Sequence, residues 1–350
     1  MRQKRFLAEQ GAPGTYHVTS RVVDKDHKFG EEEKAILLSL LRAYEAFSGG
    51  KILTYCIMSN HFHVEVKVPP RPEIMPDDAE LVRLAALADV SYGAKRLERN
   101  LAKFRKSGDH KAAEELREKF FDRMWNLSKF MQSVKQRFTQ IYNKIHGREG
   151  TLWEGRFRSV RIQNTEQAVA PVAAYVDLNP VRAGMVEDPA DYEWSGYGEA
   201  MRGGVLAQEG LKQVVMECLD SPMAGETPAA EMERVLARYR VYMFEKGETQ
   251  NPLEDGTEGR LGIDPERVAE VLRTGGKLSV FEALRCRNRY FSEGLVFGSE
   301  EYVEEIFEKH RNRFGLRREK GARELEGVNM PGMAVLGSLR RQAIHCCRPE

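Results

Sequence analysis

The sequence predicts an α+β fold in its first half. Residues 15–23 and 55–66 are rich in β-branched residues and have the composition of strands. The segment between them, residues 31–48, has helical periodicity. A strand–helix–strand order favours a sandwich in which the helix covers one sheet face and the other face is free for a site. The helix places these apolar residues on one side: Ile36, Leu37, Leu40, Leu41, Tyr44 and Phe47.

The composition limits the class of protein. The 350 residues carry a formal net charge of +1, so any nucleic-acid surface must be a local patch. The five cysteines include no C-x-x-C pair, which indicates reduced thiols in a cytoplasmic protein. No apolar run approaches the roughly 18–20 residues of a membrane span, and the charged N-terminus lacks the apolar region of a signal peptide. We therefore expect no membrane partner.

The strand at residues 55–66 contains a His-x-His pair and lies between two Gly and two Pro residues. Side chains at i and i+2 of a strand point to the same face, so His61 and His63 project together and Phe62 projects to the other side. Two imidazoles side by side on a rigid strand can bind a metal. Two surface histidines with no ligand remain the alternative.

The segment at residues 79–122 is highly charged and has a helical pattern, which favours a solvated helical insertion over a nucleic-acid contact. A second well-patterned helix is expected over residues 127–146. Residues 147–161 then interleave four arginines with two aromatic residues between glycines. Arginines bind phosphates and aromatic rings stack on unpaired bases, although the rings could instead be core anchors. The candidate nucleic-acid contacts are Arg148, Trp153, Arg156, Phe157, Arg158 and Arg161.

A third helix is expected from Thr165, a plausible N-cap, to Asn179, because the proline at position 180 disfavours helical geometry in the residue before it. Pro171 lies inside this segment and should kink the helix or mark its true start. Tyr175 and Asn179 are four residues apart and share one helix face. A tyrosine one turn from an amide could be a nucleophile beside a ligand, or a packing residue.

Together these segments resemble one family. His61-Phe62-His63 resembles the HUH motif of single-strand DNA endonucleases, in which U is a large hydrophobic residue. Residues 175–186, YVDLNPVRAGMV, closely resemble the nucleophile helix of the IS200-like transposases, nearest to the branch associated with repetitive extragenic palindromes, the REP-associated tyrosine transposases (RAYT). Residues 16–21 and 142–158 are also similar to that branch, and the resemblance covers about residues 13–200.

The resemblance implies a ferredoxin-like antiparallel sheet with packed helices, and a Y1 transposase that acts on single-stranded or hairpin DNA at palindromic repeat ends. Tyr175 is then the nucleophile, and His61, His63 and Asn179 bind Mg²⁺ or Mn²⁺. The intermediate is a 5′-phosphotyrosine. The family further implies a bacterial, cytoplasmic and nucleoid-associated protein that takes part in DNA transposition and recombination, as a monomer or a homodimer.

Two other functions stay open. One is a hairpin-DNA-binding protein that has lost catalysis, and the other is a metal-dependent hydrolase with no covalent step. Tyr142 is the rival nucleophile, although its helix is better interpreted as core and DNA contact.

We expect the chain to divide into three parts. Residues 1–200 form the catalytic domain with the charged insertion at about 79–122, and residues 201–262 form a helical extension and linker. Residues 263–350 form a small, mostly α-helical module that could bind DNA through the basic segment at residues 311–323, or could be a bundle with a solvated basic face.

Overall fold

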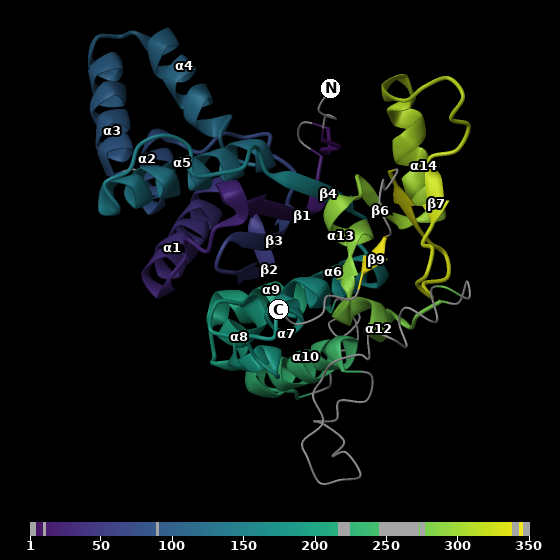
Figure 1. Ribbon diagram of the computed structural model, residues 1–350. Helices are drawn as coiled ribbons and strands as arrows, with labels where there is room; N and C mark the ends of the chain where they lie inside the picture. Colours follow the sequence, from purple (N-terminus) through teal and green to yellow (C-terminus); the bar gives the residue numbers. More distant parts are fainter. Residues whose placement is uncertain are drawn as a thin grey trace.

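A mixed seven-stranded sheet lies at the centre of the molecule, with helices on both of its faces (Figure 1). The structure is a computed structural model that describes residues 5–9, 12–88, 91–215, 225–244, 273, 277–337 and 343–345. The strand order is β2-β3-β1-β4-β6-β8-β7, and every neighbouring pair is antiparallel except β4 and β6. The strands are β1 (Gly14–Arg21), β2 (Lys51–Ile57), β3 (His61–Val68), β4 (Arg158–Ile162), β6 (Val296–Ser299), β7 (Ala322–Glu324) and β8 (Met333–Leu336). The prediction of an α+β fold is confirmed.

The pairing of β1 with β3 divides their side chains between the two sheet faces. Thr19 lies opposite His63 and Arg21 lies opposite His61 in the antiparallel register. Directly opposite residues share a face, so His17, Thr19 and Arg21 of β1 accompany the His-x-His pair. The alternate residues of the two strands belong to the hydrophobic core on the other face, and they are Tyr16, Val18, Phe62, Val64 and Val66.

Two helices build that core. Helix α1 (Glu31–Ser48) begins where Glu33 accepts a hydrogen bond from the backbone N–H of Gly30, and it ends at Gly49 in the left-handed conformation. Helix α5 (Leu127–Ile145) packs on α1 through its apolar stripe, and Asn126 caps its first turn. The helices expected at residues 31–48 and 127–146 are therefore confirmed to within one residue.

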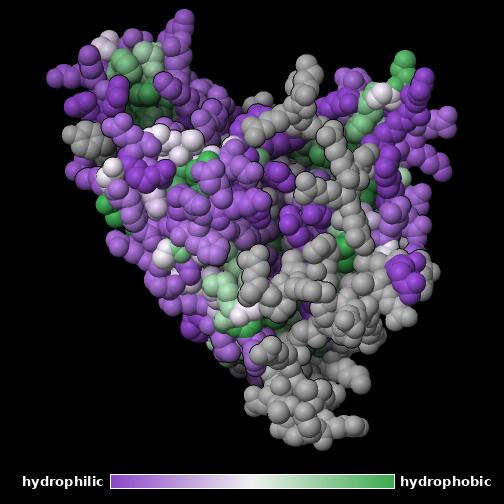
Figure 2. All heavy atoms as spheres, in the orientation of Figure 1, coloured by the Kyte–Doolittle hydropathy of each residue, from purple (hydrophilic) through white to green (hydrophobic). Residues whose placement is uncertain are grey.

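The charged segment that precedes α5 forms three helices, α2 (Asp78–Leu87), α3 (Ser91–Lys106) and α4 (His110–Phe121). They project from the sheet as an arm whose outer part carries ion pairs, such as Arg105 with Asp78 and Arg117 with Glu114 (Figure 1). The inner faces of α2 and α3 join the core, α2 through Leu81 and α3 through Leu97 and Leu101. Figure 2 shows this arm and the α14 region as two projections with a recess between them.

The opposite sheet face is covered by α6 (Glu166–Asp177), which packs on β2, β3 and β6. Pro171 lies inside α6 without ending it. The expected end at Asn179 is two residues late, because Leu178 caps α6 and Asn179 opens a separate short helix, α7 (Asn179–Arg182), with Pro180 in its first turn. Further helices pack around α6 or close the region after it: α8 (Gly196–Met201), α9 (Val205–Val214) and α10 (Pro228–Met243).

The prediction of a mostly α-helical C-terminal region is wrong. Strands β6, β8 and β7 extend the central sheet, and β5 (Arg287–Asn288) pairs with β9 (Ile344–His345) in a second small sheet. The helices of this region are short: α12 (Val280–Arg285), α13 (Arg289–Glu293), α14 (Glu300–Lys309) and the one-turn 3-10 helix Arg311–Arg313. Two further 3-10 helices lie earlier in the chain, at Val23–Lys25 and Pro189–Asp191. The expected linker at residues 251–262 lies outside the described residues. Within the described ranges no helix is long and apolar enough to cross a bilayer.

A substitution of Phe62 tests the packing of the core between the sheet and helices α1 and α5. Its side chain is 0% exposed and its ring meets Trp153 edge-on at 5.6 Å, so Phe62→Ala leaves a cavity and should lower the free energy of unfolding by about 3–5 kcal/mol. Ile74→Ala is the control, since Ile74 is 85% exposed and its removal should change stability by less than about 0.5 kcal/mol. Urea denaturation of both variants measures the difference, and equal losses would contradict this packing.

Candidate functional site

The His-x-His pair and Tyr175 meet between β3 and α6. The rings of His61 and His63 lie 5.1 Å apart, with their planes at 75°. Tyr175 lies edge-on to His63 at 6.2 Å between ring centroids. Residues more than a hundred positions apart in the chain are thereby brought together, as the sequence predicts for a shared site.

A third histidine, which the sequence analysis missed, belongs to the same cluster. His17 on β1 stacks on His63 with ring centroids 5.0 Å apart and lies 6.1 Å from the ring of Tyr175. Its Nε2 is 2.8 Å from Nδ1 of His63. Two signals in the sequence could have indicated His17. Strand alternation puts His17 and Arg21 on one face of β1, and buried polar side chains on that face need hydrogen-bond partners on the neighbouring strand.

Tyr175 is buried, with 3% of its surface exposed. The guanidinium carbon of Arg182 lies 4.0 Å from the centre of the Tyr175 ring, and Arg182 Nη2 donates a hydrogen bond of 2.7 Å to the carbonyl oxygen of the same tyrosine. The ring of Phe291, from the C-terminal region, packs against it at 5.6 Å. The ring is thus in contact with both Arg182 and Phe291.

Asn179 lies one turn beyond Tyr175 and is 9% exposed. Its amide nitrogen donates to the carbonyl oxygens of Tyr175 and Val176, at 3.3 and 3.0 Å. These bonds fix which way the amide points. The side-chain oxygen has no hydrogen-bond partner among the described residues, so it is the atom of Asn179 that can act as a ligand.

The electrostatic environment keeps both imidazoles of the pair neutral. Burial, reinforced by Arg21, Arg287 and Arg182, lowers the pKa of His61 to about 3. Burial and the two neighbouring histidines, His17 first, lower the pKa of His63 well below its usual value. A neutral imidazole has a lone pair on one nitrogen, which is the form that binds a metal.

Two imidazoles and an amide oxygen suit a divalent cation such as Mn²⁺ or Mg²⁺. In His61, Nδ1 is 2.7 Å from the side-chain oxygen of Asn60, which leaves Nε2 as the ligand atom. Within the part of the chain that the structure describes, no group of three or more His, Cys, Asp or Glu side chains is arranged to hold a metal. A site here must therefore draw on Asn179, on a bound substrate or on water.

Two buried carboxyl groups lie on the same face and were also missed. Glu65 follows His63 by two residues on β3 and is 0% exposed, and neither of its oxygens has a hydrogen-bond partner among the described residues. Burial raises the pKa of Glu65 well above its usual value. Asp177 on α6 accepts hydrogen bonds from Thr54 and Tyr239. Alternation on β3 was the available signal for Glu65.

Arginines from four segments surround the histidines. Arg21 ends β1 opposite His61, and Arg158 begins β4 opposite Thr19 on the same face. Arg287 on β5 and Arg182 on α7 complete the set, and both contribute to the lowered pKa of His61. Of the four, the sequence analysis had selected only Arg158. A positive rim around neutral imidazoles suits a phosphate ligand.

The other predicted nucleic-acid contacts are dispersed. Arg156 is exposed, as is Arg158. Arg148 is half-buried beside the Tyr142 ring, with its guanidinium carbon 5.7 Å from the ring centre. Arg161 lies opposite Tyr16 on the other sheet face, beside the ring of Tyr302.

The two aromatic residues of this segment are core residues in the structure. Trp153 is 7% exposed, and its indole N–H donates to Thr139 Oγ1 at 2.9 Å. Phe157 is 6% exposed, and the guanidinium carbon of Arg5 lies 3.6 Å from its ring centre. Neither ring offers a free face for a base. Both rings therefore pack as core anchors, the alternative to base stacking that the sequence left open.

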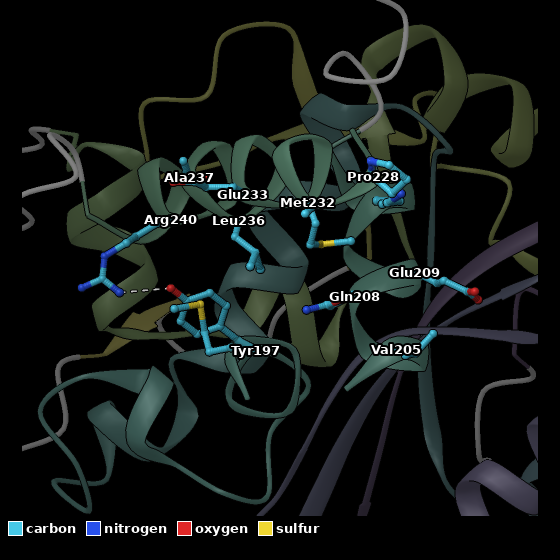
Figure 3. A pocket seen from close by; sticks show the side chains of 13 residues that line it. Tyr197, Val205, Gln208, Glu209, Pro228, Met232, Glu233, Leu236, Ala237 and Arg240 are labelled. Carbon is cyan, nitrogen blue, oxygen red and sulfur yellow. Dashed lines mark hydrogen bonds between the residues drawn. The ribbon is translucent and has the colours of Figure 1, made fainter. Parts of the chain in front are cut away.

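A pocket of about 770 Å³ lies elsewhere, between α8, α9 and α10 (Figure 3). Met232 and Leu236 point into it from α10, and Arg240 bonds to the hydroxyl of Tyr197 at its rim. None of the predicted site residues lines it. It is therefore separate from the histidine cluster.

Comparison with known proteins returned little. No family model matches the chain, and no curated protein matches it. Among solved structures, the chain is similar to a REP-associated tyrosine transposase bound to a REP hairpin, with 15% identity, coverage of 58% of this chain and 87% of that chain, and a TM-score of 0.37. A similarity of this extent assigns neither a fold family nor a function to the chain.

Lys135 on α5 anchors the loop that carries Trp153, and it gives this region a testable pH dependence. Its side chain is 8% exposed, and Nζ donates a hydrogen bond of 2.7 Å to the carbonyl oxygen of Gly155. Burial, with a smaller contribution from Arg5, lowers the pKa of Lys135 to about 8. The native state then loses this proton near pH 8, whereas the unfolded chain holds it to about pH 10.5.

The unfolded state binds more protons across that interval, so the free energy of unfolding should rise with pH between about 8 and 10.5. In Lys135→Met this rise should shrink, by up to about 3 kcal/mol. Denaturation curves at several pH values measure it. Lys129→Met, at an exposed position of the same helix, should keep the wild-type dependence, and identical profiles for all three chains would contradict the assignment.

Proposed function

We propose that the chain is a metal-dependent single-strand DNA endonuclease and strand transferase, a transposase of the Y1 type that acts on hairpin DNA through Tyr175. One observation carries the proposal. Helix α6 holds Tyr175 against the face of β3 that bears His61 and His63, with its ring 6.2 Å from that of His63. The candidate nucleophile thus lies beside one of the candidate metal ligands.

His61, His63 and Asn179 are the residues that would hold Mg²⁺ or Mn²⁺. When bound, the cation neutralises charge on a non-bridging phosphate oxygen and orients the phosphate for attack. The lone pairs for this binding come from the Nε2 of His61, from His63 and from the side-chain oxygen of Asn179. Burial keeps both histidines neutral across the physiological pH range, because it lowers their pKa values.

Tyr175 supplies the covalent step. Its hydroxyl oxygen attacks phosphorus, the bond to the 3′ oxygen breaks, the tyrosine proton is released and the leaving oxygen gains a proton. The products are a 5′-phosphotyrosine and a free 3′-OH, with no water consumed and no ATP needed. Another 3′-OH can reverse the step, so the same site cuts and joins. Arg182 keeps the ring in place through its contact with the ring and its bond to the Tyr175 carbonyl.

The DNA partner is proposed from the charged groups around the histidines. The cationic rim of Arg21, Arg158, Arg182 and Arg287 suits the phosphates around the scissile bond. Exposed Arg156 and half-buried Arg148 could extend the contact, whereas the buried rings of Trp153 and Phe157 supply structure. A palindromic hairpin with adjacent unpaired bases remains the proposed substrate, by analogy with the family that the motifs resemble.

The fold of the catalytic unit, a further DNA contact, the oligomeric state and the location are also part of the proposal. The order β4-β1-β3-β2, with antiparallel neighbours and α1 between β1 and β2, supports a ferredoxin-like catalytic unit. The basic segment at residues 311–323 is also proposed to contact DNA. Monomeric or homodimeric action and a nucleoid-associated cytoplasmic location follow from the resemblance alone.

A second candidate is a hairpin-binding protein without catalysis. The observation that favours it is the burial of Tyr175, which is 3% exposed beneath Phe291. A nucleophile must reach phosphorus, so α6 or the segment around Phe291 has to shift when DNA binds.

Tyr175→Phe tests the proposal. The wild-type chain, mixed with labelled single-stranded hairpin DNA and Mn²⁺, should give a covalent adduct that survives a denaturing gel. Tyr175→Phe should give none, because it lacks the attacking oxygen, and His61→Ala should give less than about 1% of the wild-type band, because it lacks a metal ligand.

Tyr142→Phe is the matched control, since Tyr142 is also a buried helix tyrosine, 6% exposed on α5, and it should keep the adduct. An adduct retained by Tyr175→Phe but lost in Tyr142→Phe would reverse the assignment. Tight DNA binding with no adduct from a range of hairpins would favour the silent binder, and cleavage without an adduct would indicate hydrolysis.

A further inference from the structure

The segment from α12 to α13 lies directly against the histidine cluster. Helix α13 packs on β1 and β4, and the Phe291 ring contacts Tyr175. The carbonyl oxygen of Leu284 accepts a 2.7 Å hydrogen bond from Arg182. The carbonyl oxygen of Phe291 lies 2.6 Å from Nδ1 of His17. A part of the chain that lies more than a hundred residues after Tyr175 therefore contributes backbone atoms to the site.

These contacts form a continuous chain of polar atoms, from the Phe291 carbonyl through His17 to His63. His17 is 1% exposed and His63 is 6% exposed, so water has little access to it. The two contacts measure 2.6 and 2.8 Å, which are hydrogen-bond distances. Both ring nitrogens of His17 take part in these hydrogen bonds, whereas only Nδ1 of His63 does.

The chemistry of a carbonyl fixes the direction of every bond in the chain. A carbonyl oxygen can only accept, so Nδ1 of His17 carries the hydrogen. His17 is 1% exposed, and its two ring partners are a backbone carbonyl and an imidazole, neither of which is a carboxylate that would compensate a buried positive charge. The ring is therefore taken as neutral, with a lone pair on Nε2. That lone pair must accept, so Nδ1 of His63 carries a hydrogen and its Nε2 is unprotonated.

We propose that His17 and the Phe291 carbonyl are positioning groups that fix His63 in the Nδ1–H tautomer, so that its Nε2 lone pair is available to a metal ion. The role of the Nε2 lone pair in metal binding rests on the proposed function, whereas the tautomer of His63 follows from the contacts of His17 alone. His61 reaches the same state locally, since its Nδ1 lies 2.7 Å from the side-chain oxygen of Asn60. Both histidines then offer the same nitrogen.

The proposal gives the C-terminal region a role in the site. A hydrogen bond to the far nitrogen of a metal-binding histidine orients the ring and raises its basicity, and loss of such a bond costs about 10–100-fold in metal affinity. The end of this chain of bonds is a backbone carbonyl of α13. Helix α13 therefore contributes to the face that carries the histidines.

The competing explanation is that His17 merely fills buried space with a satisfied polar group. Nitrogen NMR of the histidine-labelled, metal-free full chain at pH 7 separates the two, because protonated and unprotonated ring nitrogens differ in shift. With eight histidines, single-site variants assign the signals. We expect both His17 and His63 as neutral Nδ1–H tautomers. A protonated His17, or an Nε2–H tautomer of His63, overturns the proposal.

Substitution provides the second readout. His17→Leu should release His63 to exchange between tautomers and weaken Mn²⁺ binding about 10–100-fold by calorimetry. His17→Gln should restore much of the affinity, because an amide can accept from His63 and donate to Phe291. Thr15→Val is the control, since it removes a buried polar group from the same face of β1 without touching His63. Unchanged tautomer and affinity in His17→Leu overturn the proposal.

The two proposals can fail separately. A fixed Nδ1–H tautomer in a wild-type chain that forms no DNA adduct retains the positioning role and removes the catalytic function. An adduct from a chain in which His63 is the Nε2–H tautomer retains the function and removes the positioning role.

Discussion

The antiparallel register of β1 on β3 is the constraint on which the site depends. It places Arg21 opposite His61 and Thr19 opposite His63, and it puts His17 on the same face. A shift of β3 by one residue against β1 would turn His61 and His63 toward α1 and α5 and would bring Phe62 and Val64 to the α6 face. The register is held by burial on both faces, since Val18 and Phe62 lie in the hydrophobic core on one face and His17 and Glu65 are buried on the other. The same packing that stabilises the sheet therefore orients the histidines.

Local spacing in the sequence was enough to predict part of the site. The i, i+2 relation of His61 and His63 depends only on strand geometry and is found in β3, although the single strand expected at residues 55–66 is a hairpin in which β2 ends at Ile57 and β3 begins at His61. Tyr175 lies on α6 as expected, whereas Asn179 opens the separate helix α7. Long-range pairing was not accessible in the same way. Nothing near His17 in the sequence indicates that its partner is His63, because strand register is decided by the whole sheet.

The errors have physical causes as well. Trp153 and Phe157 occur among arginines, which suggested an exposed segment, but large aromatic rings gain most from burial and Lys135 ties their loop to α5. In the C-terminal region the strands are only two to four residues long. Such strands carry no measurable alternation, and their stability comes from the sheet that they join. Sequence periodicity is detectable in a helix as long as α14 but not in these strands.

The parallel pairing of β4 with β6 has a consequence for how this protein can be divided. Residues 161 and 162 of β4 pair with residues 296 and 297, and this contact covers what would otherwise be an open sheet edge. A fragment that ends after α8 would present unpaired N–H and C=O groups along β4, beside the apolar surface that Phe297 and Val335 now cover. Exposed edges of this kind recruit other strands. The C-terminal strands thus keep the β4 edge of the sheet paired, and a division of the chain before β6 would expose it.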